Sequence, residues 1–167
     1  MKPTAKEIAV FGMLAALMFA SKKAMESLPN IHLVGVFIVA VTVVYRQKAL
    51  YPLYTYILLE GFFGGFNTWW LPYLYVWTVL WGVTLLIPTA LPEKAQPWIY
   101  GAVCGLHGLS FGILYAPSQA LLFGFSFKTT LAWIAAGFPF DCIHGASNLI
   151  LGTLLIVPLI RIMRRFG

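Results

Sequence analysis

Residues 137–155 read GFPFDCIHGASNLILGTLL, a stretch apolar enough to lie in a membrane that nevertheless carries an acid, an imidazole and an amide. Asp141, His144 and Asn148 recur at i, i+3 and i+7, so a helix here places them on one face. An ionisable side chain inside a bilayer is costly unless it is paired or solvated. We therefore expect this face to point at protein or at a cavity rather than at lipid.

The whole chain shares the apolar character of this segment. Its 167 residues are 60% hydrophobic, 16% aromatic and only 10% charged, whereas a soluble domain has about 25% charged residues. These values predict an all-α integral membrane protein with one domain over 1–167. The first apolar segment lacks the cleavage pattern of a signal peptide. Cys104 and Cys142 both lie in apolar segments and predict no disulfide framework.

Six segments of the chain approach the length of about 20 mostly apolar residues that a transmembrane helix needs. The breaks between them contain proline, glycine or charged residues, as in SLPNIH at 27–32 and PTALPEKAQP at 88–97. Prolines in APSQ (116–119) and GFP (137–139) predict kinks within the last two segments. The six predicted transmembrane helices are 8–27, 31–45, 49–66, 70–89, 98–123 and 129–160.

The distribution of cations predicts which side each segment end faces. With both termini inside, only Lys22, Lys23 and Lys128 of the 11 Lys and Arg residues fall outside, as the positive-inside rule requires. Cations confined to segment ends also argue against nucleic acid as a partner. We therefore expect a multi-pass protein of the plasma membrane with its N- and C-termini in the cytoplasm.

Glu60 is a second acid placed deep in an apolar segment. It lies about eleven residues into its helix, and a rise of ~1.5 Å per residue carries it past the midplane into the outer half. Asp141 follows the Pro139 kink, also in the outer half. The polar face that contains Asp141 fits either a hydrogen-bond network that orders the bundle or direct contacts to a ligand. No metal site is predicted, because Cys104 and His107 have no further ligands at convincing spacing.

Aromatic residues form a second pattern, on the fourth segment. Trp70, Tyr73, Trp77 and Trp81 recur at helical spacing, and Asn67 lies in the turn before them. An interfacial aromatic belt or simple core packing explains part of this stripe. A platform on which a planar ligand stacks explains the depth of Trp77 better. Asn67 fits either turn formation or a bond to the ligand.

Charged residues close the first segment. Lys22, Lys23 and Glu26 lie at its outer end, and Lys22 and Glu26 are spaced for an ion pair. The lysines either extend to the interface or form a cationic edge for a carboxylate or phosphate.

The first segment also carries small residues at a spacing of four. Gly12, Ala16 and Ala20 allow another helix to approach closely. The approaching helix is either another segment of this chain or a partner membrane protein.

Two sequence motifs are informative together: AALMFA at 15–20 and GFPFDCIHGASNLILGTLL at 137–155. With these motifs, its length, its six segments and its basic C-terminus, the chain resembles the substrate-binding S component of an energy-coupling factor (ECF) transporter, in its riboflavin-transporter-like branch. The resemblance implies high-affinity binding of a vitamin or vitamin-like heterocycle from outside: a flavin, cobalamin or its precursor, or a deazapurine. It also implies a transmembrane coupling subunit, contacted through Gly12, Ala16 and Ala20, and two ATPase subunits.

The chain itself has no phosphate-cradling loop, and we expect no enzyme activity and no cofactor. The pocket is expected between the fourth and sixth segments and the turns at 28–34 and 64–69. The expected substrate-binding residues are Glu60, Asn67, Trp70, Tyr73, Trp77, Asp141, His144 and Asn148.

Two functions of other classes stay open. One is a small intramembrane enzyme with Asp141 and His144 as an acid–base pair. The other is a membrane assembly protein that binds no ligand.

Overall fold

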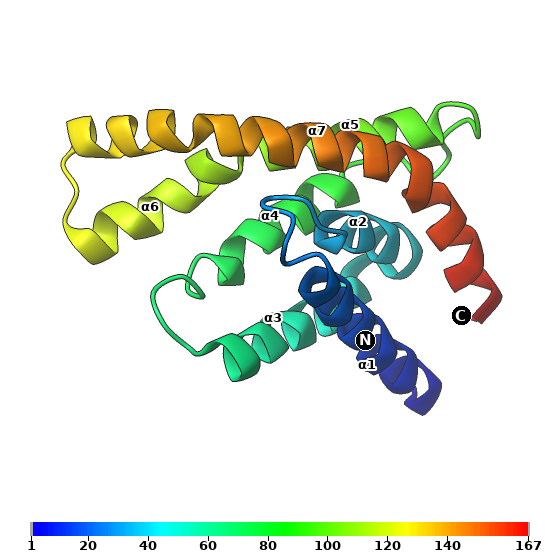
Figure 1. Ribbon diagram of the computed structural model, residues 1–167. Helices are drawn as coiled ribbons and strands as arrows, with labels where there is room; N and C mark the ends of the chain where they lie inside the picture. The colour runs from blue at the N-terminus through cyan, green and yellow to red at the C-terminus, as the bar shows by residue number, and fades with distance from the viewer. Residues whose placement is uncertain (1, 167) are drawn as a thin grey trace.

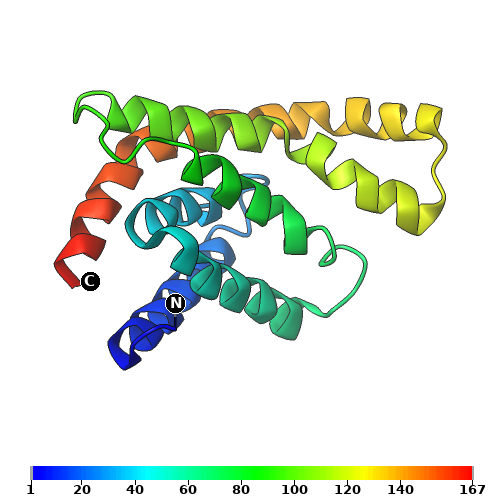
Figure 2. The ribbon, with the colours of Figure 1, turned by 180° about the vertical axis from the view of Figure 1, so that it is seen from behind.

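The computed structural model describes residues 2–166, which are built of helices joined by loops and contain no β-strand (Figure 1). This arrangement confirms the predicted all-α class. The longest element, α7, has 40 residues and lies along α5 in both ribbon views (Figures 1 and 2). In order, the elements are α1 (Ala5–Ala24), α2 (Val34–Tyr45), the 3-10 helix η1 (Arg46–Ala49), α3 (Leu50–Gly64), α4 (Tyr73–Leu85), α5 (Gln96–Leu109), α6 (Phe111–Phe123) and α7 (Phe127–Phe166).

Three helical stretches are long and apolar enough to cross a membrane: Val34–Gly64, Gln96–Phe123 and Phe127–Arg165. The shorter helix α4 is also apolar. Helix α1 is not among these stretches, because charged residues occupy both of its end turns. The lengths and composition of these helices are those of a membrane protein.

The first turn of α1 is fixed by a capping box. The Glu7 backbone N–H donates to the Thr4 hydroxyl, and the Thr4 backbone N–H donates to the Glu7 carboxylate at 2.8 Å. Lys48 on η1 also donates to this carboxylate, at 2.6 Å, and its ammonium holds the pKa of Glu7 below the ordinary value. The start of α1 is thereby tied to the junction between α2 and α3.

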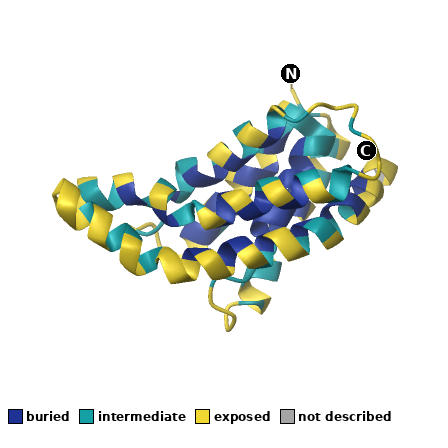
Figure 3. Cartoon of the chain, turned by 90° about the horizontal axis from the view of Figure 1, so that it is seen from above, coloured by how far each residue is buried: buried dark blue, intermediate teal, exposed yellow. Residues whose placement is uncertain are grey.

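Helix α2 occupies the centre of the fold. Its residues from Val34 to Thr42 are all buried, as expected for a helix that is apolar on every side. It packs against α7, α4, α1 and α5. Figure 3 shows burial concentrated in the middle of the molecule and exposed residues at the end where α6 joins α7. Exposed apolar side chains there, such as Leu121 and Phe127, suit a lipid-facing surface.

The last two predicted segments differ from the structure in where they are interrupted. The segment predicted over 98–123 is divided into α5 and α6 at Ser110, and Pro117 lies within α6. The division occurs at Ser110 because a distant side chain holds the first turn of α6, as described below. Helix α7 continues through Pro139, and its change of direction in Figure 1 is in its last third, which contains Pro158.

Candidate ligand-binding site

The fully buried indole of Trp77, on α4, is the centre of a cluster of aromatic and imidazole rings. Its ring centroid lies 5.5 Å from that of His107 on α5 and 5.9 Å from that of His32, in the loop between α1 and α2. The His32 ring lies 4.8 Å from the ring of His144 on α7. Elements far apart in the sequence therefore meet here. We call this group the Trp77 cluster, and it consists of His32, Tyr73, Trp77, His107, Phe111 and His144.

The indole and the three imidazoles of the cluster each have a buried nitrogen with no hydrogen-bond partner among residues 2–166. These atoms are Nε1 of Trp77, Nδ1 of His32, Nδ1 of His107 and Nε2 of His144. The other ring nitrogen of His107 lies 3.0 Å from the carbonyl oxygen of Val76; it must donate, which leaves Nδ1 as an acceptor. An unpartnered buried polar atom costs about 1–3 kcal/mol. A group of them indicates that a ligand or water supplies the missing bonds.

Asn148 extends this buried polar region by one turn of α7. It is completely buried, and neither atom of its amide group has a partner in the described chain. Its Nδ2 lies against two glycines, since a Cβ added to Gly35 would come within 3.4 Å of it and one added to Gly108 within 2.9 Å. Glycine at these positions lets α2 and α5 approach α7 closely and leaves the amide at their junction.

A cavity of about 210 Å³ adjoins the Trp77 cluster. It lies between the end of α1, the loop that follows and helices α4, α6 and α7. Trp77 itself lies deeper than the cavity wall and is inaccessible in this conformation. The wall residues that matter here are Lys22, His32, Tyr73, Phe111 and His144.

The lysine at the cavity wall is neutralised from within the protein. Lys22 Nζ lies 2.6 Å from Glu60 Oε2 and 3.3 Å from the Tyr73 hydroxyl, with Glu60 almost completely buried. The ion pair that the spacing of Lys22 and Glu26 allows is not formed, and Glu26 pairs instead with Lys23, at 3.0 Å. Lys22 instead turns inward, where its attraction to the buried carboxylate of Glu60 offsets part of the cost of desolvating that carboxylate.

Asp141 acts as a cap for α6. Both of its carboxylate oxygens lie 3.1 Å from the backbone N–H of Gly112, in the first turn of that helix. This is a stabilising position for a negative charge, because the first N–H groups of a helix lack partners within it. Among the described residues no hydrogen bond joins Asp141 to His144, and the hydrogen bonds of the carboxylate go to Gly112.

Two further residues expected at the site contact other parts of the protein. Asn67 is exposed in the turn before α4, and its Oδ1 accepts from the backbone N–H of Trp69 at 3.3 Å. The indole N–H of Trp70 donates to the carbonyl of Ile57 at 2.7 Å and fastens this turn to α3.

Two residues of the site were not expected from the sequence. Helical spacing could not identify His32, which lies in a loop, or Phe111, whose sequence context is the same as that of other apolar residues.

The residues that were expected at the site divide into two groups. The structure brings Glu60, Tyr73, Trp77, His144 and Asn148 into one buried region, and it places Asn67, Trp70 and Asp141 outside it.

The small residues of α1 lie on its exposed side. Gly12, Ala16 and Ala20 are exposed, and a Cβ added to Gly12 would meet nothing within 4 Å. The opposite face, which includes Leu14 and Met18, is buried in the core. The small-residue face is therefore not used for packing within the described chain.

No family model, no curated protein and no solved structure matches this chain. The functional interpretation therefore rests on the geometry above, taken together with the sequence resemblance.

Proposed function

We propose that this chain is the substrate-binding S subunit of an ECF-type transporter that imports a vitamin-like heterocycle. In this proposal six helical units cross the plasma membrane, α5 and α6 forming one of them, with both termini in the cytoplasm. The supporting observation is the cavity itself, whose wall includes the rings of His32 and His144, with the unpartnered polar atoms of Trp77 and Asn148 buried behind it. The imbalance of cations supports the orientation.

The size of the cavity favours a small ligand. Pockets for drug-sized ligands begin at about 300 Å³, whereas this cavity has about 210 Å³. That volume corresponds to roughly seven water molecules at ~30 Å³ each. A bicyclic ring, such as a deazapurine or a benzimidazole-type precursor, suits this space better than a whole cobalamin.

The charges at the cavity favour a neutral ligand. Lys22 is paired with Glu60 and Lys23 with Glu26, so neither ammonium is left uncompensated to hold a carboxylate or phosphate. The unpartnered groups, by contrast, match the edge of a heterocycle that carries both N–H donors and ring-nitrogen or carbonyl acceptors. His32 and His144 present such nitrogens at the cavity wall, and the donor of Trp77 and the amide of Asn148 lie behind them.

The exposed small-residue face of α1 supports the proposal that a partner subunit binds there. Gly12, Ala16 and Ala20 allow the backbone of another membrane helix to approach closely. In our proposal this helix belongs to the coupling subunit, and ATP hydrolysis occurs in the two ATPase subunits.

The proposal is tested by ligand binding to the purified protein in detergent. We expect a copurifying heterocycle, detected by absorbance and by mass spectrometry after denaturation. Candidate flavins, benzimidazoles and deazapurines should quench tryptophan fluorescence on titration. His144→Phe removes an unpartnered ring nitrogen at the cavity wall and should weaken binding about tenfold, whereas Trp98→Phe, at an exposed position, should leave binding unchanged. A protein that binds none of these classes would refute the proposed function.

A further inference from the structure

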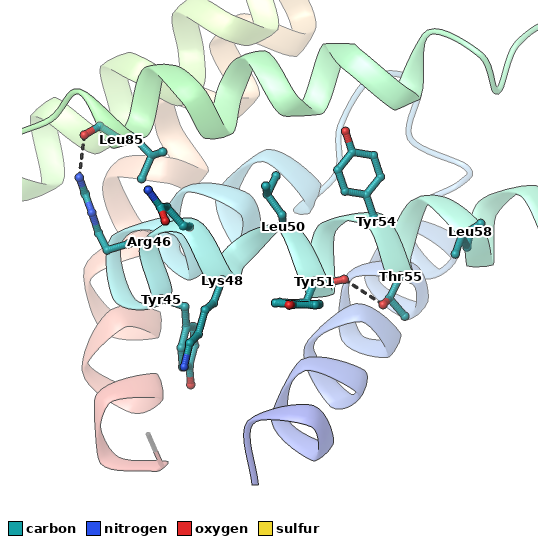
Figure 4. Close-up of a pocket in the computed structure, with 10 residues that line it drawn as sticks. Tyr45, Arg46, Lys48, Leu50, Tyr51, Tyr54, Thr55, Leu58 and Leu85 are labelled. Carbon is teal, nitrogen blue, oxygen red and sulfur yellow. Dashed lines mark hydrogen bonds between the residues drawn. The ribbon is translucent and has the colours of Figure 1, made fainter. Parts of the chain in front are cut away.

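A second and larger cleft lies away from the Trp77 cluster, at the end of the molecule near both termini. It has a volume of about 790 Å³ and is bounded by η1, α3 and the end of α4 (Figure 4). Its charged end is close to both ends of the chain, because Lys48 pairs with Glu7 near the start of α1 and Arg46 shares a smaller adjoining cavity with Arg164 of α7.

One wall of the cleft is apolar and runs along α3. The side chains of Leu50, Tyr51, Tyr54 and Leu58 line it, and Figure 4 shows them following α3 away from Arg46. Eight residues of α-helix rise about 12 Å, and one leaflet of a bilayer core is about 15 Å thick. The wall is therefore about as long as one leaflet is thick.

The other end of the cleft carries a cation without an acidic partner. Arg46 donates to the carbonyl oxygen of Leu85 at 2.7 Å, and no carboxylate lies within ion-pair distance of it in residues 2–166 (Figure 4). A guanidinium has five N–H donors, so most of them remain for a ligand.

The backbone holds Arg46 in this position at a cost. Its φ of +53° is uncommon for a residue other than glycine. The carbonyl of Arg46 accepts a hydrogen bond from the indole N–H of Trp81 at 3.1 Å, which fixes this turn between α2 and α3. Strained positions of this kind recur at binding sites.

We propose that this cleft binds one anionic phospholipid from the leaflet nearest the chain termini, with the phosphate at Arg46 and one acyl chain along α3. A guanidinium matches a phosphate with paired hydrogen bonds, and tyrosines at both sides suit the membrane interface. A soluble anion would leave the apolar wall unused, and a neutral lipid would leave the charge of Arg46 uncompensated. Basic pockets between membrane helices bind anionic headgroups in the same way.

The test compares dioleoyl phosphatidylglycerol with dioleoyl phosphatidylcholine as ligands of the purified full-length protein in detergent, with bound lipid counted by native mass spectrometry. We expect the wild type to bind the anionic lipid about tenfold more tightly. Arg46→Gln should abolish this preference. Leu58→Trp, which fills the exposed apolar wall and keeps the cation, should weaken binding of both lipids. Arg161→Gln, at an exposed position outside the cleft, is the matched control and should retain the preference.

Several outcomes would overturn the proposal. Equal binding of the two lipids by the wild type, or the same loss of preference in Arg161→Gln as in Arg46→Gln, would show that the cleft does not recognise the headgroup. Glycerol phosphate that displaces the lipid at equal concentration would show that the acyl chain contributes nothing. Unchanged lipid binding in Leu58→Trp would place the lipid elsewhere, even if Arg46→Gln does not fold. A membrane protein cross-linked at residue 58 in place of lipid would identify a protein partner instead.

Discussion

Replacing Asp141 with alanine should destabilise the protein without lowering its affinity for the proposed ligand. The carboxylate is buried and lies 3.1 Å from the Gly112 N–H through each oxygen. Loss of a helix cap costs about 0.5–2 kcal/mol, and loss of a hydrogen bond to a charged group costs about 1.5–3 kcal/mol. We therefore expect Asp141→Ala to lower the free energy of unfolding by roughly 1–3 kcal/mol. For a chain of this length each kcal/mol shifts Tm by about 2–4 °C.

The assay is thermal unfolding of the ligand-free protein in detergent, together with ligand affinity at a temperature where both variants are folded. Asp141→Asn keeps an oxygen acceptor for Gly112 and should recover part of the lost Tm. Glu93→Gln, at an exposed position between α4 and α5, is the control and should leave Tm unchanged. An unchanged Tm with a tenfold or larger loss of affinity in Asp141→Ala would refute the capping role and make Asp141 a ligand contact.

Two further predictions concern α1. Lys22→Met leaves the buried carboxylate of Glu60 unpaired and should destabilise the protein by about 3 kcal/mol, which is the lower end of the range for a broken buried pair because Lys22 is partly exposed. Adding Glu60→Gln should recover most of the lost Tm. A Lys22→Met variant as stable as the wild type would contradict the role of the pair. Ala16→Leu, on the exposed face of α1, should leave ligand affinity and Tm unchanged but stop cellular uptake, because a leucine side chain prevents close helix approach. Uptake at the wild-type rate would refute the proposal that this face binds the partner subunit.

Most of the helical segments could be predicted because the breaks between them carry a local signal. Glycine, proline and charged residues mark the loops after α1, α3 and α4, whereas the predicted break at 45–52 is the 3-10 helix η1, which joins α2 to α3 without a loop. The division at Ser110 was not predicted, although Gly108 and Gly112 flank it, because glycines recur at 101, 105, 108 and 112 without marking one position. The start of α6 is held by Asp141, which follows Gly112 by 29 residues, and a contact of this range leaves no trace in local periodicity.

The same limit applies to the candidate site. Helical spacing correctly puts Asp141, His144 and Asn148 on one face of α7, but it does not say which element each of them meets. Asp141 contacts the start of α6, whereas Asn148 lies against α2 and α5. Local spacing suggested Asp141 and His144 as a pair because they are neighbours on the helix. In the structure the carboxylate of Asp141 accepts from the Gly112 N–H, because the first N–H groups of a helix have no partners within it.

His32 is the most informative omission, because it connects the loop after α1 to the Trp77 cluster. Its ring lies 4.8 Å from that of His144 and 5.9 Å from that of Trp77, and it also lines the cavity. Loop residues have no periodicity from which a direction can be predicted, and SLPNIH is an ordinary turn sequence by composition. Asn30, two residues earlier, has a φ of +60° and its carbonyl accepts from the Ser147 hydroxyl at 3.3 Å. Asn30 in this left-handed conformation turns the chain, and two residues later the imidazole of His32 lies at the cavity wall against the ring of His144.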